Sequence, residues 1–255
     1  MSRIGLIRRL AGGLLAVACL VPLVHGQGGP PMLTDDPGTP GDRHWEINTA
    51  WICEQRAGET VSELPLLDVN YGIGEHLQLK YEASWLHAHG SNEARESGLS
   101  NSLVGVKWRF LDEDKAGVAV STYPQFEFRN PGSSSARRGL TDDENAMLLP
   151  IEVLKDLGAL SVDVDVGRVF HRRSDDSWFY GCAVGREVNK RLELAVELHG
   201  ESDREFARGE LAANFGARIR CCDHGTLLLS IGRELRNRDE PRATLLSYVG
   251  WQLTL

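Results

Sequence analysis

The stretch His76-Leu77-Gln78-Leu79-Lys80-Tyr81-Glu82-Ala83-Ser84-Trp85 contains the pattern that decides the fold. Apolar and aromatic residues occupy every second position, and polar or charged residues fill the positions between them. Successive side chains of a β-strand point to opposite sides, so this alternation predicts a strand with one apolar face and one polar face.

The same alternation recurs along the chain, at 104–110, 160–166, 192–198 and 249–255. The predicted strands are 44–54, 61–73, 76–88, 99–111, 116–130, 145–156, 159–171, 177–188, 190–201, 207–221, 225–236 and 243–255. Their lengths suit strands that cross a bilayer at a tilt. We therefore expect an all-β fold, an antiparallel up-and-down transmembrane β-barrel of about 12 strands.

The predicted connections alternate in length. Short ones lie at 72–75, 112–115, 156–158, 189–190 and 222–225, whereas longer polar ones include 89–96, 130–138, 172–176 and 236–241. Outer-membrane barrels have short periplasmic turns and longer external loops. The pattern predicts that the short set is periplasmic and that both ends of the barrel lie on that side.

A soluble exported sandwich or barrel is the competing interpretation, because its strands also alternate. Aromatic side chains near strand ends favour the membrane, since they form girdles at the two bilayer interfaces. Those on the predicted apolar face are Trp45, Trp51, Tyr81, Trp85, Trp108, Phe110 and Trp251.

The first residues predict a secretory signal peptide over 1–26. Arg3, Arg8 and Arg9 precede an apolar run over 10–24, and small residues follow it. An uncleaved anchor and a lipidated Cys19 are the alternatives, but Pro22 interrupts the run. The remaining chain divides into a periplasmic N-terminal segment, 27–43, and the barrel, 44–255, which places the protein in the outer membrane of a Gram-negative bacterium.

Charge excludes nucleic acid as a partner. The chain has 28 Lys and Arg against 36 Asp and Glu, a net charge of −8, which becomes −11 without the three Arg of the expected signal. Binding to phosphate backbones requires a basic patch instead. The expected partners are outer-membrane lipid and a small-molecule solute, and the sequence sets no oligomeric state.

No pattern of catalytic or metal-binding residues is present. The nucleophile motif G-x-S-x-G is absent, and no spacing unites His and Ser residues into a triad, so we expect no enzyme activity. Cys53, Cys182, Cys221 and Cys222 follow no zinc spacing, and their pairing stays open. No cofactor and no metal are expected.

The polar face of the predicted strands would line the lumen. Its members are Asp68, Asn70, Lys80, Glu82, Lys107, Arg109, Gln125, Glu127, Glu152, Asp163, Asp165, Glu193, Glu197, Arg218 and Arg220. Two interpretations stay open. These charges line a water-filled path and select solutes, or they pair with one another and fill the lumen. The acids gather on the sixth, seventh and ninth predicted strands and the bases near the periplasmic ends of the fourth and tenth, which would create an axial field.

The segment Thr34-Asp35-Asp36-Pro37-Gly38-Thr39-Pro40-Gly41 precedes the first strand and is rich in turn formers. It lacks the alternation of a wall strand. One interpretation is a rigid double turn that directs the chain into the barrel. The other is a short plug in which Asp35 and Asp36 enter the lumen and meet Lys or Arg.

This motif, with Trp45-Glu46-Ile47-Asn48 after it, resembles the start of a bacterial family named after the MetA pathway of phenol degradation, whose members are labelled transporters. The resemblance covers only the beginning of the barrel. It implies an outer-membrane channel or transporter for small organic compounds, aromatic ones included. A lumen-plugged structural or ligand-binding barrel is the alternative. One departure is the final residue, Leu255, where outer-membrane barrels carry an aromatic residue.

Overall fold

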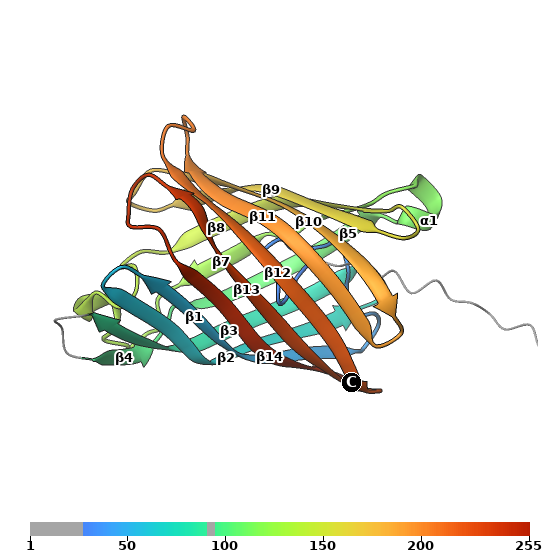
Figure 1. Ribbon diagram of the computed structural model, residues 1–255, viewed down its shortest axis with the longest axis horizontal. Helices are drawn as coiled ribbons and strands as arrows, with labels where there is room; N and C mark the ends of the chain where they lie inside the picture. Colours follow the sequence, from blue (N-terminus) through green and yellow to red (C-terminus); the bar gives the residue numbers. More distant parts are fainter. Residues whose placement is uncertain (1–27, 91–94) are drawn as a thin grey trace, which may run out of the picture.

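A single antiparallel sheet forms nearly all of the computed structural model, which describes residues 28–90 and 95–255. The strands are β1 (Trp45–Arg56), β2 (Glu59–Ile73), β3 (Leu77–Gly90), β4 (Glu96–Leu99), β5 (Ser102–Leu111), β6 (Ala119–Thr122), β7 (Gln125–Phe128), β8 (Ala146–Asp156), β9 (Ser161–His171), β10 (Ser177–Asn189), β11 (Leu192–Asp203), β12 (Gly209–Cys222), β13 (Gly225–Asn237) and β14 (Leu245–Thr254). β1 pairs with β14 from Glu46–Thr254 to Gln55–Leu245, which closes the sheet into a barrel (Figure 1). The expected signal peptide lies outside the described residues.

The wall of the barrel has twelve strands, because two of them are interrupted. β4 and β5 pair with successive parts of β3, and β6 and β7 pair with successive parts of β5. The second break falls at Tyr123-Pro124. Proline has no backbone N–H to donate to a ladder, so Pro124 removes one possible ladder bond at this break. The predicted fold class, a closed antiparallel barrel of this size, is confirmed.

Two short helical turns accompany the strands in the described parts of the chain. α1 (Glu113–Ala116) replaces the simple turn predicted at 112–115, and η1 (Ala136–Arg138) lies in a long loop. Ala116 N–H donates to the Asp112 carbonyl over 2.9 Å, and Gly117 ends α1 with a φ of 77°. No described helix has the length and apolar character needed to span a membrane.

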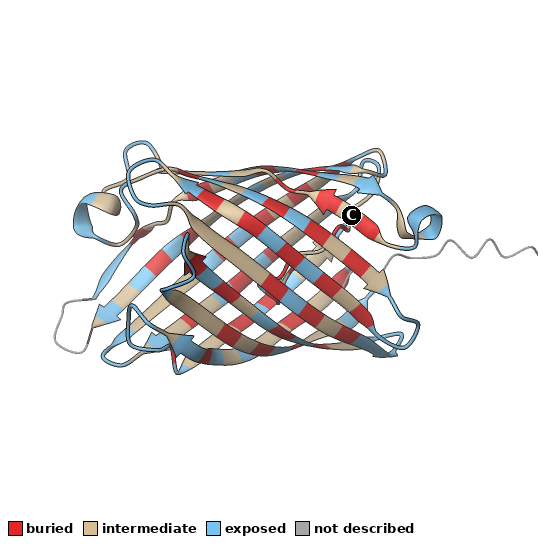
Figure 2. Cartoon of the chain, turned by 90° about the horizontal axis from the view of Figure 1, so that it is seen from above, coloured by how far each residue is buried: buried red, intermediate tan, exposed pale blue. Residues whose placement is uncertain are grey.

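The distribution of buried and exposed side chains is the reverse of that in a soluble protein, with apolar side chains outside and charged ones inside. Trp108 and Ile231 are 52% and 58% exposed, whereas Glu152 is 0% exposed and Lys107 is 2% exposed. Buried and exposed residues alternate along the strands (Figure 2). All seven aromatic residues predicted on the apolar face are exposed. An apolar surface of this extent requires lipid around it, which argues against the soluble alternative.

The two rims of the barrel differ. One, which we call the turn rim, carries α1, the tight β2–β3, β8–β9, β10–β11 and β12–β13 connections, and both ends of the barrel wall (Figure 1). The other, the loop rim, carries the longer connections, for example 129–145 between β7 and β8. The two-residue β1–β2 turn is an exception on the loop rim. Residues 28–43 enter the barrel from the turn rim.

We predict that the exposed face tolerates charge only near the rims. Val166 lies at the centre of β9 and is 47% exposed. Val166→Arg should lower the free energy of unfolding in lipid vesicles by about 2–4 kcal/mol, because Arg would lie at the bilayer midplane. Equilibrium denaturation followed by tryptophan fluorescence measures this.

The matched control is Val188→Arg, since Val188 is outward and 50% exposed but lies at the turn-rim end of β10. Val188→Arg should lower the free energy of unfolding by only about 0–1 kcal/mol. If both substitutions lowered the free energy of unfolding equally, the centre of β9 would not lie at the bilayer midplane.

Candidate functional site

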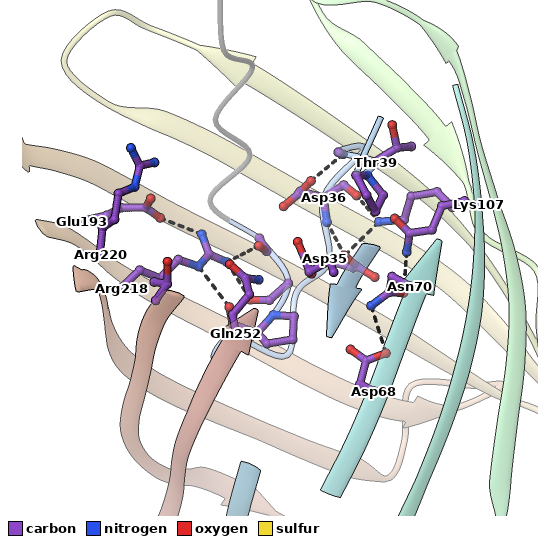
Figure 3. Close-up of a pocket in the computed structure, with 18 of the residues that line it drawn as sticks. Asp35, Asp36, Thr39, Asp68, Asn70, Lys107, Glu193, Arg218, Arg220 and Gln252 are labelled. Atoms are coloured by element: carbon purple, nitrogen blue, oxygen red, sulfur yellow. Dashed lines mark hydrogen bonds and ion pairs between the residues drawn. The ribbon is translucent and has the colours of Figure 1, made fainter. Parts of the chain in front are cut away.

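Residues 28–43, which we call the N-terminal segment, run from the turn rim into the barrel (Figure 3). The segment folds on itself, since Gly29 N–H donates to the Thr34 carbonyl over 2.7 Å and Met32 N–H to the Gly29 carbonyl over 2.9 Å. It is fastened to the turn rim near β1, where Gly74 N–H donates to Asp42 Oδ1 over 2.8 Å. The part from Gly28 to Pro40 therefore reaches into the lumen from an anchored end.

Two carboxylates of the wall hold the backbone of this segment. Glu197 on β11 accepts hydrogen bonds from Leu33 N–H at 2.9 Å and Thr34 N–H at 2.9 Å. Asp165 on β9 accepts from Asp35 N–H at 3.2 Å. These charge-assisted bonds are stronger than bonds between neutral groups. The wall carboxylates therefore bind backbone N–H groups of the segment. Pairing of oppositely charged side chains in the sequence does not reveal such contacts.

Arg218 on β12 holds the other end of the segment. Its guanidinium donates to the carbonyls of Gly28, Gly29 and Pro30, at 2.9 Å for Gly29 and 3.0 Å for Pro30. It also binds Glu193 at 2.7 Å (Figure 3). The planar guanidinium offers five donors in a fixed fork, so one side chain can serve three carbonyls and a carboxylate together.

Lys107 on β5 is the central cation of the site. Its Nζ lies 3.0 Å from Asp35 Oδ1 and 3.4 Å from Glu152 Oε2, and it also donates to the Asp36 carbonyl. Burial disfavours ionisation of Asp35, but the charges of Lys107 and Lys80 together with the hydrogen bonds to Asp35 outweigh burial and lower the pKa of its carboxyl. The ion pair thus joins the segment to the wall on the side opposite Glu197.

Asp35 and Asp36 differ in their contacts: one makes the contact expected of a plug, and the other makes the contact expected of a turn. Asp35 meets Lys107, as the plug interpretation requires. Asp36 instead accepts from Gly38 N–H at 2.5 Å, which is the local bond of a turn. Asp35 thus connects the segment to the wall, whereas Asp36 shapes the segment around the buried Pro37.

Glycines in the wall make room for the segment. A Cβ on Gly181 of β10 would lie 2.3 Å from Thr34 Oγ1, and one on Gly216 of β12 would lie 1.8 Å from Met32 Cε. Neither position could carry a side chain without moving the segment. The inner surface of the wall is therefore shaped to the residues that it encloses.

The segment and the inward side chains around it are closely packed. Thr34, Asn48 and Glu152 are all 0% exposed. A cavity of about 260 Å³ remains on the turn-rim side, and a second of about 400 Å³ lies at the loop rim. The first is lined by Lys80, Arg218 and Arg220 among others, and the second by acids such as Glu201 and Asp239. Cavities thus lie toward both ends of the barrel.

The remaining predicted lumen residues lie in smaller groups. Lys80 Nζ lies between Asp68 and Glu82, at 3.4 and 2.8 Å. Glu127 accepts from Asn101 at 2.9 Å, toward the loop rim. Asp163 is on β9, opposite Leu154 of β8 and Ala183 of β10, and is 0% exposed.

Arg109 lies at the turn rim, where its Nε is 3.1 Å from Asp112 Oδ1. Hydrogen bonds from Lys115 and His76 hold the pKa of Asp112 well below its usual range. Arg109 is therefore part of a cluster of charges around α1 and does not reach the N-terminal segment.

Several residues of the site escaped sequence analysis. Leu33 and Thr34 contribute backbone N–H groups, which every residue has, so no sequence signal marks them. Tyr123, whose ring lies 4.6 Å from Lys107 Nζ, sits in an interrupted strand where alternation fails. Gly181 and Gly216 occupy inward positions of alternating strands, and this unusual placement is the one signal that could have revealed a close neighbour.

The described cysteines form no disulfide. Cys53 is buried, and Cys182, Cys221 and Cys222 are exposed thiols. The barrel is held by its ladders and internal polar contacts.

A closed barrel with an exposed apolar face and a charged interior is the architecture of porin-like outer-membrane β-barrels. No protein-family model matches the sequence, and no curated protein matches it. The resemblance to the MetA-pathway family therefore stays a prediction.

Solved structures match the fold. The structure of an outer-membrane channel from Pseudomonas putida F1 has a TM-score of 0.72 at 12% identity, covering 86% of this chain and 98% of that chain. The NanC porin has a TM-score of 0.59 at 11% identity, covering 82% and 100%. The KdgM porin, in complex with disordered oligogalacturonate, has a TM-score of 0.57 at 13% identity, covering 81% and 98%. At these identities the likeness concerns the fold alone.

We predict that Lys107 is required for stability of the closed barrel. Lys107→Met would leave Asp35 and Glu152 without the ammonium that they share. Breaking a buried pair on one side costs about 3–5 kcal/mol, measurable by denaturation in detergent micelles or lipid.

The double variant Lys107→Met/Asp35→Asn should recover part of that loss, because one uncompensated carboxylate is removed. Lys115→Met at the exposed turn rim is the control and should have little effect. A loss at Lys107 no larger than at Lys115 would contradict the central role of this ammonium.

Proposed function

We propose that this protein is a channel of the outer membrane whose lumen the N-terminal segment closes and, on release, opens. The observation that carries the proposal is the way the segment is held. Its bonds to Glu197, Asp165, Arg218 and Lys107 are polar, and its covalent connection to the wall lies at the turn rim. Water can replace polar partners at much lower cost than it can replace buried apolar contacts. A segment held in this way can leave the lumen while the wall stays intact.

The proposed solutes are small organic compounds. The cavities of about 260 and 400 Å³ on either side of the segment are lined mainly by polar and charged groups, which favours small polar solutes. The resemblance of the opening motif to a family linked with phenol degradation extends the proposal to small aromatic compounds. In this view the turn rim faces the periplasm and the loop rim faces the exterior.

The first test of gating is conductance in planar lipid bilayers. Asp35→Ala/Asp36→Ala removes the ion pair to Lys107 and the turn bond to Gly38 together. We expect a larger open probability than in the wild type, because both the attachment and the shape of the segment are lost.

Asp42→Ala is the matched control, since Asp42 belongs to the same segment but binds Gly74 at the rim. It should leave the open probability close to that of the wild type. If the double variant and the wild type both stay closed at every voltage, the channel proposal is wrong. The alternative of a permanently plugged structural or binding barrel then stands.

A second experiment addresses the solute. A strain that lacks this protein should take up small phenols more slowly than the parent strain when the external concentration is low, because diffusion through the outer membrane is then limiting. Uptake of sugars of similar size is the comparison. Complementation with Asp35→Ala/Asp36→Ala should restore phenol uptake at least to the parent rate. Equal loss of phenol and sugar uptake would reject aromatic selectivity, and no loss of either would reject transport of these solutes.

A further inference from the structure

Three polar side chains form a row across adjacent strands near the turn rim. Arg220 on β12 is directly opposite Thr226 on β13, and Thr226 is directly opposite Gln252 on β14. Directly opposed residues have Cβ atoms about 4.5–5.5 Å apart. All three residues line the cavity of about 260 Å³ on the turn-rim side, and Arg220 and Gln252 are seen beside it in Figure 3. We call these three residues the turn-rim row.

The polar groups of the turn-rim row have no partners in the described parts of the chain. No hydrogen bond or ion pair joins the Arg220 guanidinium, the Thr226 hydroxyl or the Gln252 amide to another described group. Arg218, two residues before Arg220, differs because its guanidinium binds three carbonyls of the N-terminal segment and Glu193. The donors of Arg220 are therefore available to a molecule in the cavity.

Positive charge exceeds negative charge around Arg220. The part of the lining that comes from β10, β11, β12 and the β10–β11 turn contains four cations and two acids, namely Lys190, Arg191, Arg218 and Arg220 against Glu187 and Glu193. Arg220 N–H donates to the Arg191 carbonyl over 2.8 Å, so these two arginines are neighbours. Neighbouring like charges repel each other, and a bound anion relieves that repulsion.

The acids on the other side of the cavity are held by other groups. Asp68 lies 3.4 Å from Lys80, and Asp35 lies 3.0 Å from Lys107. Asp36 accepts the turn bond from Gly38 N–H, and Glu46 accepts from Asn48 Nδ2 over 3.3 Å. None of these four acids forms an ion pair with Arg220, so they leave its charge without compensation.

We propose that the turn-rim row binds a small organic carboxylate that also carries a hydroxyl group. Arg220 holds the carboxylate, because its planar guanidinium presents parallel N–H donors that match the two carboxylate oxygens. Thr226 and Gln252 bind the hydroxyl, since each of them offers both a donor and an acceptor. The inference rests on the proposed function and names a preferred class, the hydroxycarboxylates, among its small organic solutes.

The size and position of the cavity suit such a solute. Drug-sized ligands occupy pockets of about 300–1,000 Å³, so a cavity of about 260 Å³ admits a smaller compound. Arg220 is exposed near the end of β12 at the turn rim. The cavity is present with the N-terminal segment in place, so binding to the turn-rim row does not require the segment to leave.

4-Hydroxybenzoate is the probe for the test, because it carries a carboxylate and a hydroxyl on one small ring. Its binding to the protein folded in detergent is measured by titration calorimetry, with benzoate and phenol in parallel. We expect saturable binding that is tightest for 4-hydroxybenzoate. Phenol lacks the carboxylate and should bind about tenfold more weakly or less still, because it cannot form the charge-assisted bonds to Arg220.

Arg220→Gln removes an exposed guanidinium that has no partner, so the barrel should fold as the wild type does. It should weaken the binding of 4-hydroxybenzoate and of benzoate about tenfold or more. Thr226→Val should weaken the binding of 4-hydroxybenzoate about fivefold and leave that of benzoate unchanged, because benzoate has no hydroxyl.

Arg186→Gln is the matched control, since Arg186 is an exposed arginine near the turn-rim end of β10 that does not line the cavity. It should bind 4-hydroxybenzoate as the wild type does. Absence of saturable binding to the wild type would overturn the inference, as would equal affinity for phenol and 4-hydroxybenzoate. An equal loss in Arg186→Gln and Arg220→Gln would assign binding to the general charge of the rim and also overturn it.

The two proposals fail by different measurements. Calorimetry in detergent requires no open channel, and the conductance of Asp35→Ala/Asp36→Ala requires no solute. A barrel that conducts but does not bind 4-hydroxybenzoate would refute the turn-rim row alone. A barrel that binds 4-hydroxybenzoate but stays closed at every voltage would refute the channel proposal alone.

Discussion

Every backbone N–H and C=O group that faces lipid must find its partner within the protein, because the bilayer core offers no water to replace it. In this chain the requirement is met by the pairing of β1 with β14, which leaves no open edge in the wall. Closure then forces each strand to divide its residues between lipid and lumen. Residues such as Val166 face outward and residues such as Asp165 face inward for that reason alone.

The same division of residues between lipid and lumen places charged side chains inside the barrel, where buried carboxylates need partners. Inward carboxylates at Glu197 and Asp165 are buried in a narrow barrel and cannot stay without partners. The N-terminal segment supplies them with backbone N–H groups, and Lys107 and Arg218 supply positive charge and donors to the segment. The segment and the wall thus satisfy each other, which is why a chain without regular secondary structure keeps one defined path inside the barrel.

This mutual dependence is also compatible with the proposed opening of the lumen. A core of interlocked apolar side chains would close the barrel permanently, since opening it would expose apolar surface to water. Polar contacts exchange for water at modest net cost, provided that no charge is left buried alone. The glycines at 181 and 216 present no side chain where the segment lies, so in the proposed opening no wall side chain at these positions would block its departure.

Alternation in the sequence by itself determined the all-β class, the approximate strand boundaries, the outward aromatic residues and the inward position of charges such as Lys107 and Glu152. These properties are local, because a period of two can be recognised within one strand. The interruptions at β4–β5 and β6–β7, and the helical turn α1, were missed because they depend on how neighbouring strands fit. Only the tertiary structure decided which charges meet, that Asp35 binds Lys107 while Asp36 forms a turn, and that Glu197 holds the backbone of Leu33 and Thr34. Such contacts join residues far apart in the chain through the shear and closure of the barrel, and no pattern within a single strand encodes that geometry.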